Sequence, residues 1–181
     1  NAFVIFVTGG SQGAHAVNEI ASKAMEFLKR ELDSRSGAVR PLYVIHQTGR
    51  ADEACVMMQY SKSAIPARVK AFEDNMADAF ASADFVIARA GASTCFELAA
   101  CAKPALLIPL PTSMRNHQHH NALAFAGVKA ADLGIQEKLS PSQLARYLLS
   151  VYDNPEKLQQ MAFSAKSLSV HDAADRFADV V

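Results

Sequence analysis

The chain has 181 residues, with 18 basic and 18 acidic side chains and therefore a formal net charge of zero. Half of its residues are hydrophobic, which is enough for one sizeable core, and the basic surface typical of nucleic-acid-binding proteins is absent. No apolar run approaches the roughly 18 residues of a membrane span, so any membrane contact is expected to be peripheral.

Three cysteines, at positions 55, 95 and 101, follow no metal-binding spacing. An odd number of cysteines without a signal peptide indicates reduced thiols in a cytoplasmic protein. The chain opens on Asn1 and enters a strand directly, so we expect the start of the natural protein to be missing.

The first unit is a strand, a glycine-rich turn and a helix. Ala2–Val7 is a continuous apolar run, as in a parallel strand buried on both faces. Thr8–Ala14 follows, with Gly9, Gly10 and Ser11, and apolar residues then recur at helical spacing. Glycines let the backbone come close to a ligand at the positive end of a helix, although a pair of glycines is also consistent with a simple βα turn.

Strands and helices then alternate. Further strands are predicted at Leu42–His46, Arg68–Phe72, Phe85–Ala88, Pro104–Pro109 and, more weakly, Ala130–Leu133, with helices at Asp52–Tyr60 and Met76–Ala83. This order predicts an α/β fold, a doubly wound parallel sheet of about six strands. Ligands of such sheets bind beyond the carboxyl ends of the strands.

The segment Arg89–Glu97 directly follows a buried strand. Gly91 breaks the apolar run, and Ser93 or Thr94 is expected to cap a helix that begins at once. Free backbone N–H groups at such a helix end bind anions, and Glu97 projects from the same helix face. The combination predicts a nucleotide whose diphosphate meets the helix end and whose ribose meets the acid. Alternatively, Glu97 only stabilises the first turn of its helix.

The segment Pro109–Asn121 is the most polar loop of the chain and is expected to lead into a helix through Ala122. Its three histidines, at 117, 119 and 120, raise the possibility of a metal site, but a fourth ligand is missing and zinc requires defined spacing. The favoured interpretation is a pocket-lining loop in which Gln118 and Asn121 supply hydrogen bonds.

Three helices are expected to complete the chain. Ser140 and Gln143 form a capping box for a helix over Pro141–Val151, Asn154 starts the next, and His171–Val181 forms the last. No repeat or break in composition is evident, so residues 1–181 are predicted to form one domain.

Four motifs together resemble one family. Gly9–Ala14, Phe72–Met76, Arg89–Glu97 and Asn116–Ala122 are similar, in order and spacing, to the donor-binding half of MurG-type glycosyltransferases. The resemblance implies the Rossmann-like C-terminal domain of a GT-B enzyme that moves N-acetylglucosamine (GlcNAc) from UDP-GlcNAc to undecaprenyl-pyrophosphoryl-MurNAc-pentapeptide for peptidoglycan.

The resemblance also implies roles for individual residues. Ser11 would contact the donor phosphate, the backbone around Phe72 and Glu73 the uracil, and Glu97 the ribose. The diphosphate and sugar would be held by Ala92, Ser93 and Thr94, the GlcNAc hydroxyls by Gln118, and the supporting positions would be Gly9, Gly10, Gly91 and Asn121. No role follows for His15.

The acceptor half of such an enzyme is absent from the chain, and with it the general base. The resemblance therefore implies no catalytic residue in this fragment, which would be inactive alone, and no metal or other cofactor. The partners would be UDP-GlcNAc and, through the missing N-terminal domain, a lipid-linked acceptor. The full-length protein would be peripheral on the cytoplasmic face of the inner membrane.

Two alternatives remain. One is a stand-alone catalytic subunit that pairs with a membrane-anchored protein, as in the dolichol-linked GlcNAc transferase, although the abrupt start at Asn1 argues against it. The other is a non-catalytic Rossmann-type nucleotide-binding domain. It is disfavoured because Gly9-Gly10-x-x-Gly13 lacks the full dinucleotide fingerprint and because His46-Gln47, not an acid, ends the second strand.

Overall fold

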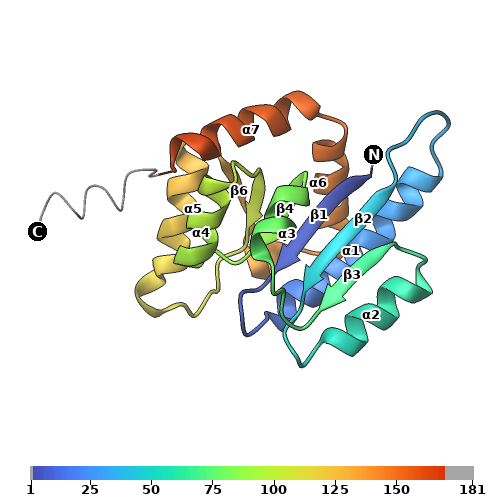
Figure 1. Ribbon diagram of the computed structural model, residues 1–181, viewed down its shortest axis with the longest axis horizontal. Coiled ribbons are helices and arrows are strands. Elements are labelled where there is room, and N and C mark those ends of the chain that lie inside the picture. Colours follow the sequence, from blue (N-terminus) through green and yellow to red (C-terminus); the bar gives the residue numbers. More distant parts are fainter. Residues whose placement is uncertain (1, 170–181) are drawn as a thin grey trace, which may run out of the picture.

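A six-stranded parallel sheet forms the centre of the molecule in the computed structural model, which describes residues 2–169 (Figure 1). The strand order is β3-β2-β1-β4-β5-β6. The strands are β1 (Phe3–Thr8), β2 (Leu42–Gln47), β3 (Ala67–Lys70), β4 (Phe85–Ala88), β5 (Ala105–Leu107) and β6 (Ala131–Leu133). The predicted doubly wound α/β fold is confirmed.

Helices cover both faces of the sheet. They are α1 (His15–Asp33), α2 (Glu53–Lys62), α3 (Met76–Ser82), α4 (Ala92–Ala100), α5 (His117–Gly127), α6 (Pro141–Tyr152) and α7 (Pro155–Ser167), with short 3₁₀ turns η1 (Met114–Asn116) and η2 (Gln136–Lys138). Helices α1, α2 and α6 pack on one face of the sheet, and α3, α4 and α5 on the other. Helix α7 contributes Met161 to the first core and Ala165 to the second, so it bridges the two layers (Figure 1).

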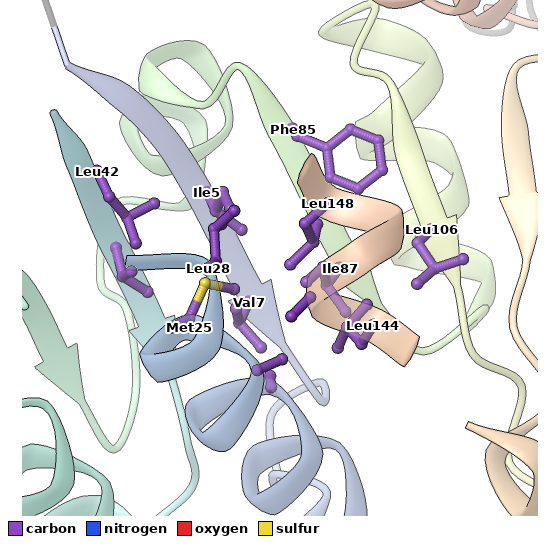
Figure 2. Close-up of a cluster of buried hydrophobic side chains, with 14 of the residues drawn as sticks. Ile5, Val7, Met25, Leu28, Leu42, Phe85, Ile87, Leu106, Leu144 and Leu148 are labelled. Atoms are coloured by element: carbon purple, nitrogen blue, oxygen red, sulfur yellow. The ribbon is translucent and has the colours of Figure 1, made fainter. Parts of the chain in front are cut away.

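Successive β1 side chains alternate between the two cores because the strand is buried on both faces. Ile5 and Val7 enter the α1/α6 core, whereas Phe6 enters the core under α3 to α5. Figure 2 shows Met25 and Leu28 of α1 and Leu144 and Leu148 of α6 directed at the side chains of the sheet. The apolar strands therefore fix the sheet in the middle of the layers.

Several predicted boundaries are wrong. The third strand is Ala67–Lys70 rather than Arg68–Phe72, and its last residue lies opposite Gln47, the last residue of β2. Helix α5 begins at His117, so the end of the predicted polar loop is helical. The predicted helix over His171–Val181 lies outside the described residues.

The predicted helix starts in the C-terminal part are confirmed. Ser140 Oγ accepts from the N–H of Gln143, whose Oε1 in turn accepts from the N–H of Ser140, and together they form the expected capping box. Asn154 caps α7 by accepting from the N–H of Lys157.

A buried polar chain crosses the α1/α2 layer at the end of β2. Asn18 donates through Nδ2 to Thr48 O (2.8 Å) and Asp52 Oδ2 (2.8 Å), so its Oδ1 is left to accept from Nε2 of His46 (3.1 Å). Nδ1 of His46 then accepts the hydroxyl proton of Tyr60 (2.9 Å). His46 is therefore held as one neutral tautomer, and burial lowers its pKa to about 3.

We expect the protein to lose stability in mild acid because of His46. In the unfolded chain His46 is protonated with its ordinary pKa of 6.5, whereas in the folded protein its pKa is about 3. The stability that neutral His46 allows is therefore complete above about pH 6.5 and is lost as the pH falls below it. The expected loss of unfolding free energy is about 2 kcal/mol between about pH 8 and about pH 5. Urea unfolding of the parent and of a His46→Gln variant measures it, and an equal pH slope in both proteins would contradict the assignment.

Candidate functional site

The turns that follow β1 and β4 lie side by side at the centre of the sheet. Strand β1 pairs with β4, and the backbone N–H of Arg89 donates to Thr8 O (3.3 Å) just beyond the strand ends. From this point the chain leaves β1 for α1 on one face and leaves β4 for α4 on the other. This is the switch point of a doubly wound sheet, where a ligand finds a crevice between two helix ends.

The first glycine turn is fixed by close packing of its backbone. A side chain on Gly9 would meet the backbone N of Ala14 at 2.4 Å, and Gly13 closes the turn by donating to Gly10 O (3.0 Å). Ser11, at the tip, is exposed. Helix α1 has neither a side-chain cap nor an acidic residue in its first turn, so its N–H groups are available to an anion.

Helix α4 starts earlier than the sequence suggested, and the predicted cap is wrong. Gly91 is the N-cap because its extended backbone lets its carbonyl accept from the N–H of Cys95 (3.0 Å). Ser93 and Thr94 therefore lie in the first turn, where Ser93 is exposed and Thr94 is buried. With no side-chain cap and no acid in this turn, α4 offers a second set of available N–H groups.

Glu97 lies in the second turn of α4. The alternative that it only stabilises the first turn is wrong, because α4 begins at Ala92 and has no acidic residue in that turn. Within the described residues the Glu97 carboxylate has no hydrogen-bond or ion-pair partner. Partial burial raises its pKa. A half-buried acceptor of this kind is suited to the hydroxyl groups of a ligand.

Gln47 joins the first glycine turn to the segment after β3. Its Nε2 donates to Gly10 O (2.9 Å), and its Oε1 accepts from the N–H of Glu73 (3.1 Å). The Glu73 side chain is buried and pairs with Arg68 (3.1 Å) and Lys70 (3.2 Å). A uracil contact in this segment therefore has to use backbone groups other than the N–H of Glu73. Phe72 next to it is exposed.

Gln118 and Asn121 both lie on α5. Gln118 accepts through Oε1 from the N–H of Leu110 (2.9 Å), and its Nε2 has no protein partner in the described part of the chain. Asn121 donates to Ala90 O (3.0 Å), which ties α5 to the turn before α4. The structure thus ties Asn121 to the turn before α4 and Gln118 to the segment after β5, and it leaves the Nε2 donor of Gln118 available.

The three histidines of α5 do not assemble a metal site. Among residues 2–169 no group of three His, Cys, Asp or Glu side chains is arranged to hold a metal ion. His119 instead lines a cavity of about 280 Å³ at the ends of β5 and β6, together with Leu110, Ile135 and Gln136.

Arg89 is a site residue to which the sequence assigned no role. Its buried guanidinium donates to the carbonyls of Ile108 and Pro109 (both 3.1 Å) and to Oε1 of Gln136 (2.6 Å). It thereby links the end of β4 to the segment after β5 and to η2. An arginine directly after a fully apolar strand is the signal that could have identified it.

A family model described as the glycosyltransferase family 28 C-terminal domain matches residues 4–177. The chain belongs to this family. It is 35% identical over 175 residues to a relative from Geotalea uraniireducens and 38% identical over 178 residues to one from Brucella suis. Both relatives are named UDP-N-acetylglucosamine--N-acetylmuramyl-(pentapeptide) pyrophosphoryl-undecaprenol N-acetylglucosamine transferase.

The family 28 domain accounts for about half of these relatives. The matches cover 97% and 98% of this chain but only 46% and 45% of the two relatives. The crystal structure of Acinetobacter baumannii MurG superposes with a TM-score of 0.86 at 29% identity, covering 100% of this chain and 52% of that one. No described helix is both long and apolar enough to cross a membrane.

Proposed function

We propose that this family 28 domain binds UDP-GlcNAc as the donor half of a transferase that passes GlcNAc to lipid-linked MurNAc-pentapeptide. The observation that carries the proposal is the pair of uncapped helix ends at one switch point, with the unpartnered Glu97 carboxylate on α4. Two sets of free N–H groups suit the two phosphates of a diphosphate, and an acid nearby suits ribose hydroxyls. The names of the relatives support the choice of sugar nucleotide.

Each predicted site residue has a place in this proposal. Ser11 and the α1 end contact one phosphate, and Ala92, Ser93 and Thr94 at the α4 end contact the other phosphate and the sugar. Glu97 accepts from the ribose hydroxyls, Phe72 and its neighbouring backbone face the uracil, and Nε2 of Gln118 donates to GlcNAc. Gly9, Gly10, Gly91 and Asn121 shape the turns.

The chemical contribution of this domain is stabilisation of the departing UDP. Negative charge grows on the diphosphate as the bond to the sugar breaks, and preorganised N–H groups at helix ends stabilise that charge without a metal ion. A general base has to reach the acceptor hydroxyl, and we assign no described residue to that step. The proposal therefore places acceptor binding in another domain of the full-length protein, peripheral on the cytoplasmic face of the membrane.

Calorimetry on the 181-residue chain tests the donor assignment. Titration with UDP-GlcNAc, UDP-glucose and ADP-glucose should show binding of the uridine nucleotides and weaker binding of ADP-glucose, because the proposed site recognises the uracil through the backbone around Phe72. Absence of binding, or no preference for uridine, would overturn it. A stand-alone subunit would share this donor site, and the gene sequence upstream of Asn1 distinguishes it from a two-domain enzyme.

A dinucleotide-binding domain is disfavoured by the end of β2. His46 and Gln47 occupy the position where a ribose-binding acid would stand, and both side chains are held in hydrogen bonds within the protein.

A further inference from the structure

His15 is a candidate ligand contact that neither the motifs nor the family resemblance assigned. It is the first residue of α1, four residues beyond Ser11 in the glycine turn. Its side chain is 79% exposed, and its Nδ1 lies 2.8 Å from Oδ1 of Asp52. The ring is therefore accessible at the helix end that the proposed function gives to a phosphate, yet one of its nitrogens is fixed.

Asp52 is a rigid partner for this ring. Its side chain is only 15% exposed, and its second oxygen accepts from Nδ2 of Asn18 (2.8 Å), which is itself anchored to Thr48 O. The carboxylate orients the imidazole by accepting the proton on Nδ1, as acids commonly do for functional histidines. Nε2 is then the ring nitrogen without a partner among the described residues.

The surroundings favour the imidazolium form. The hydrogen bond and the charge of Asp52 raise the pKa of His15 above its ordinary value of 6.5, and Glu19 on the next turn of α1 adds a smaller effect. Glu19 is itself paired with Lys23 (2.7 Å). His46, at the inner end of the same hydrogen-bond chain, stays neutral because its pKa is about 3. The positive N-terminal end of α1 disfavours the imidazolium form of His15, and the negative charge of a bound diphosphate would offset this effect.

We infer that His15, oriented by Asp52, donates from Nε2 to the diphosphate of the donor in its protonated form, so that donor affinity falls as the pH rises. The inference rests on the proposed function and adds a regulation of the same site. The direction of this pH dependence distinguishes His15 from the carboxylates of the site. A carboxylate such as Glu97 becomes a stronger hydrogen-bond acceptor as the pH rises, so it would make donor affinity rise with pH.

Calorimetric titration of the chain with UDP-GlcNAc, from about pH 6 to about pH 9, tests the inference. This ligand suits the experiment because its diphosphate, esterified at both ends, loses no proton in that range. We expect the parent to bind about three- to tenfold more weakly at the alkaline end, as is reasonable for loss of one exposed charge-assisted hydrogen bond.

Three variants and a control sharpen the test. His15→Gln should bind at every pH as weakly as the parent does at high pH, and His15→Arg should bind tightly without pH dependence. Asp52→Asn should move the parent transition to lower pH. His120→Gln, which removes another exposed imidazole, should follow the parent.

A flat profile for the parent, or the same profile in His15→Gln, would overturn the inference while leaving donor binding intact. Failure of UDP-GlcNAc to bind at any pH would overturn the proposed function as well. Thermal unfolding of each variant shows whether a change in binding reflects loss of fold.

Discussion

Gly13→Ala should lower the unfolding free energy by about 3 to 5 kcal/mol, because it combines backbone strain with a clash that no side chain can relieve. Gly13 has a φ of +77°, and an added Cβ would lie 2.1 Å from the carbonyl oxygen of Thr48. The turns after β1 and β2 pack backbone against backbone here, since a Cβ added to Gly49 would likewise lie only 2.6 Å from Gln12 O. Urea unfolding measures the loss.

Gly37→Ala is the matched control. Gly37 also has a positive φ, of +109°, but an added Cβ would meet nothing within 4 Å. The expected loss is therefore only the backbone strain, about 1 to 2 kcal/mol. Similar losses in the two variants would show that the contact between the two turns contributes nothing.

Glu97→Ala should weaken UDP-GlcNAc binding about 100-fold, because two ribose hydroxyls would lose a charged acceptor worth about 3 kcal/mol in total. Stability should change by less than about 0.5 kcal/mol, since the carboxylate has no partner among the described residues and its burial is unfavourable. Calorimetry and urea unfolding measure the two quantities separately.

A donor analogue without ribose hydroxyls makes the test specific to the ribose. The parent should bind this analogue about as weakly as Glu97→Ala binds UDP-GlcNAc, and the variant should not distinguish the two ligands. The control is Glu31→Ala, which removes an exposed acid from α1, away from α4, and should leave the affinity for UDP-GlcNAc unchanged. Parent-like affinity in Glu97→Ala would remove the ribose assignment.

The order of elements could be predicted from the sequence because it depends on local patterns. Continuous apolar runs such as Phe85–Ala88 specify strands buried on both faces, and Ser140 with Gln143 specifies a helix start, whatever the rest of the chain does. Alternation of such elements leaves few topologies, so the parallel sheet and the gathering of the glycine turns at one edge followed directly.

Boundaries at the candidate site could not be predicted in the same way. Ser93 and Thr94 are both good capping residues, yet the extended backbone of Gly91 makes that residue the N-cap and starts α4 at Ala92 instead. The end of β3 was equally non-local, because the strand is defined by its pairing with β2, whose last paired residue is Gln47.

What the sequence by itself determined was the fold and the residue types of the site, since hydrophobic period and turn chemistry are local properties. The tertiary structure alone decided which polar groups are used by the protein and which are left for a ligand. Hydrogen bonds between distant residues consume the N–H of Glu73, the ring nitrogens of His46 and one nitrogen of His15. The Glu97 carboxylate, in contrast, remains without a partner in the described part of the chain. Such pairing depends on distances across the sheet, which no local pattern encodes.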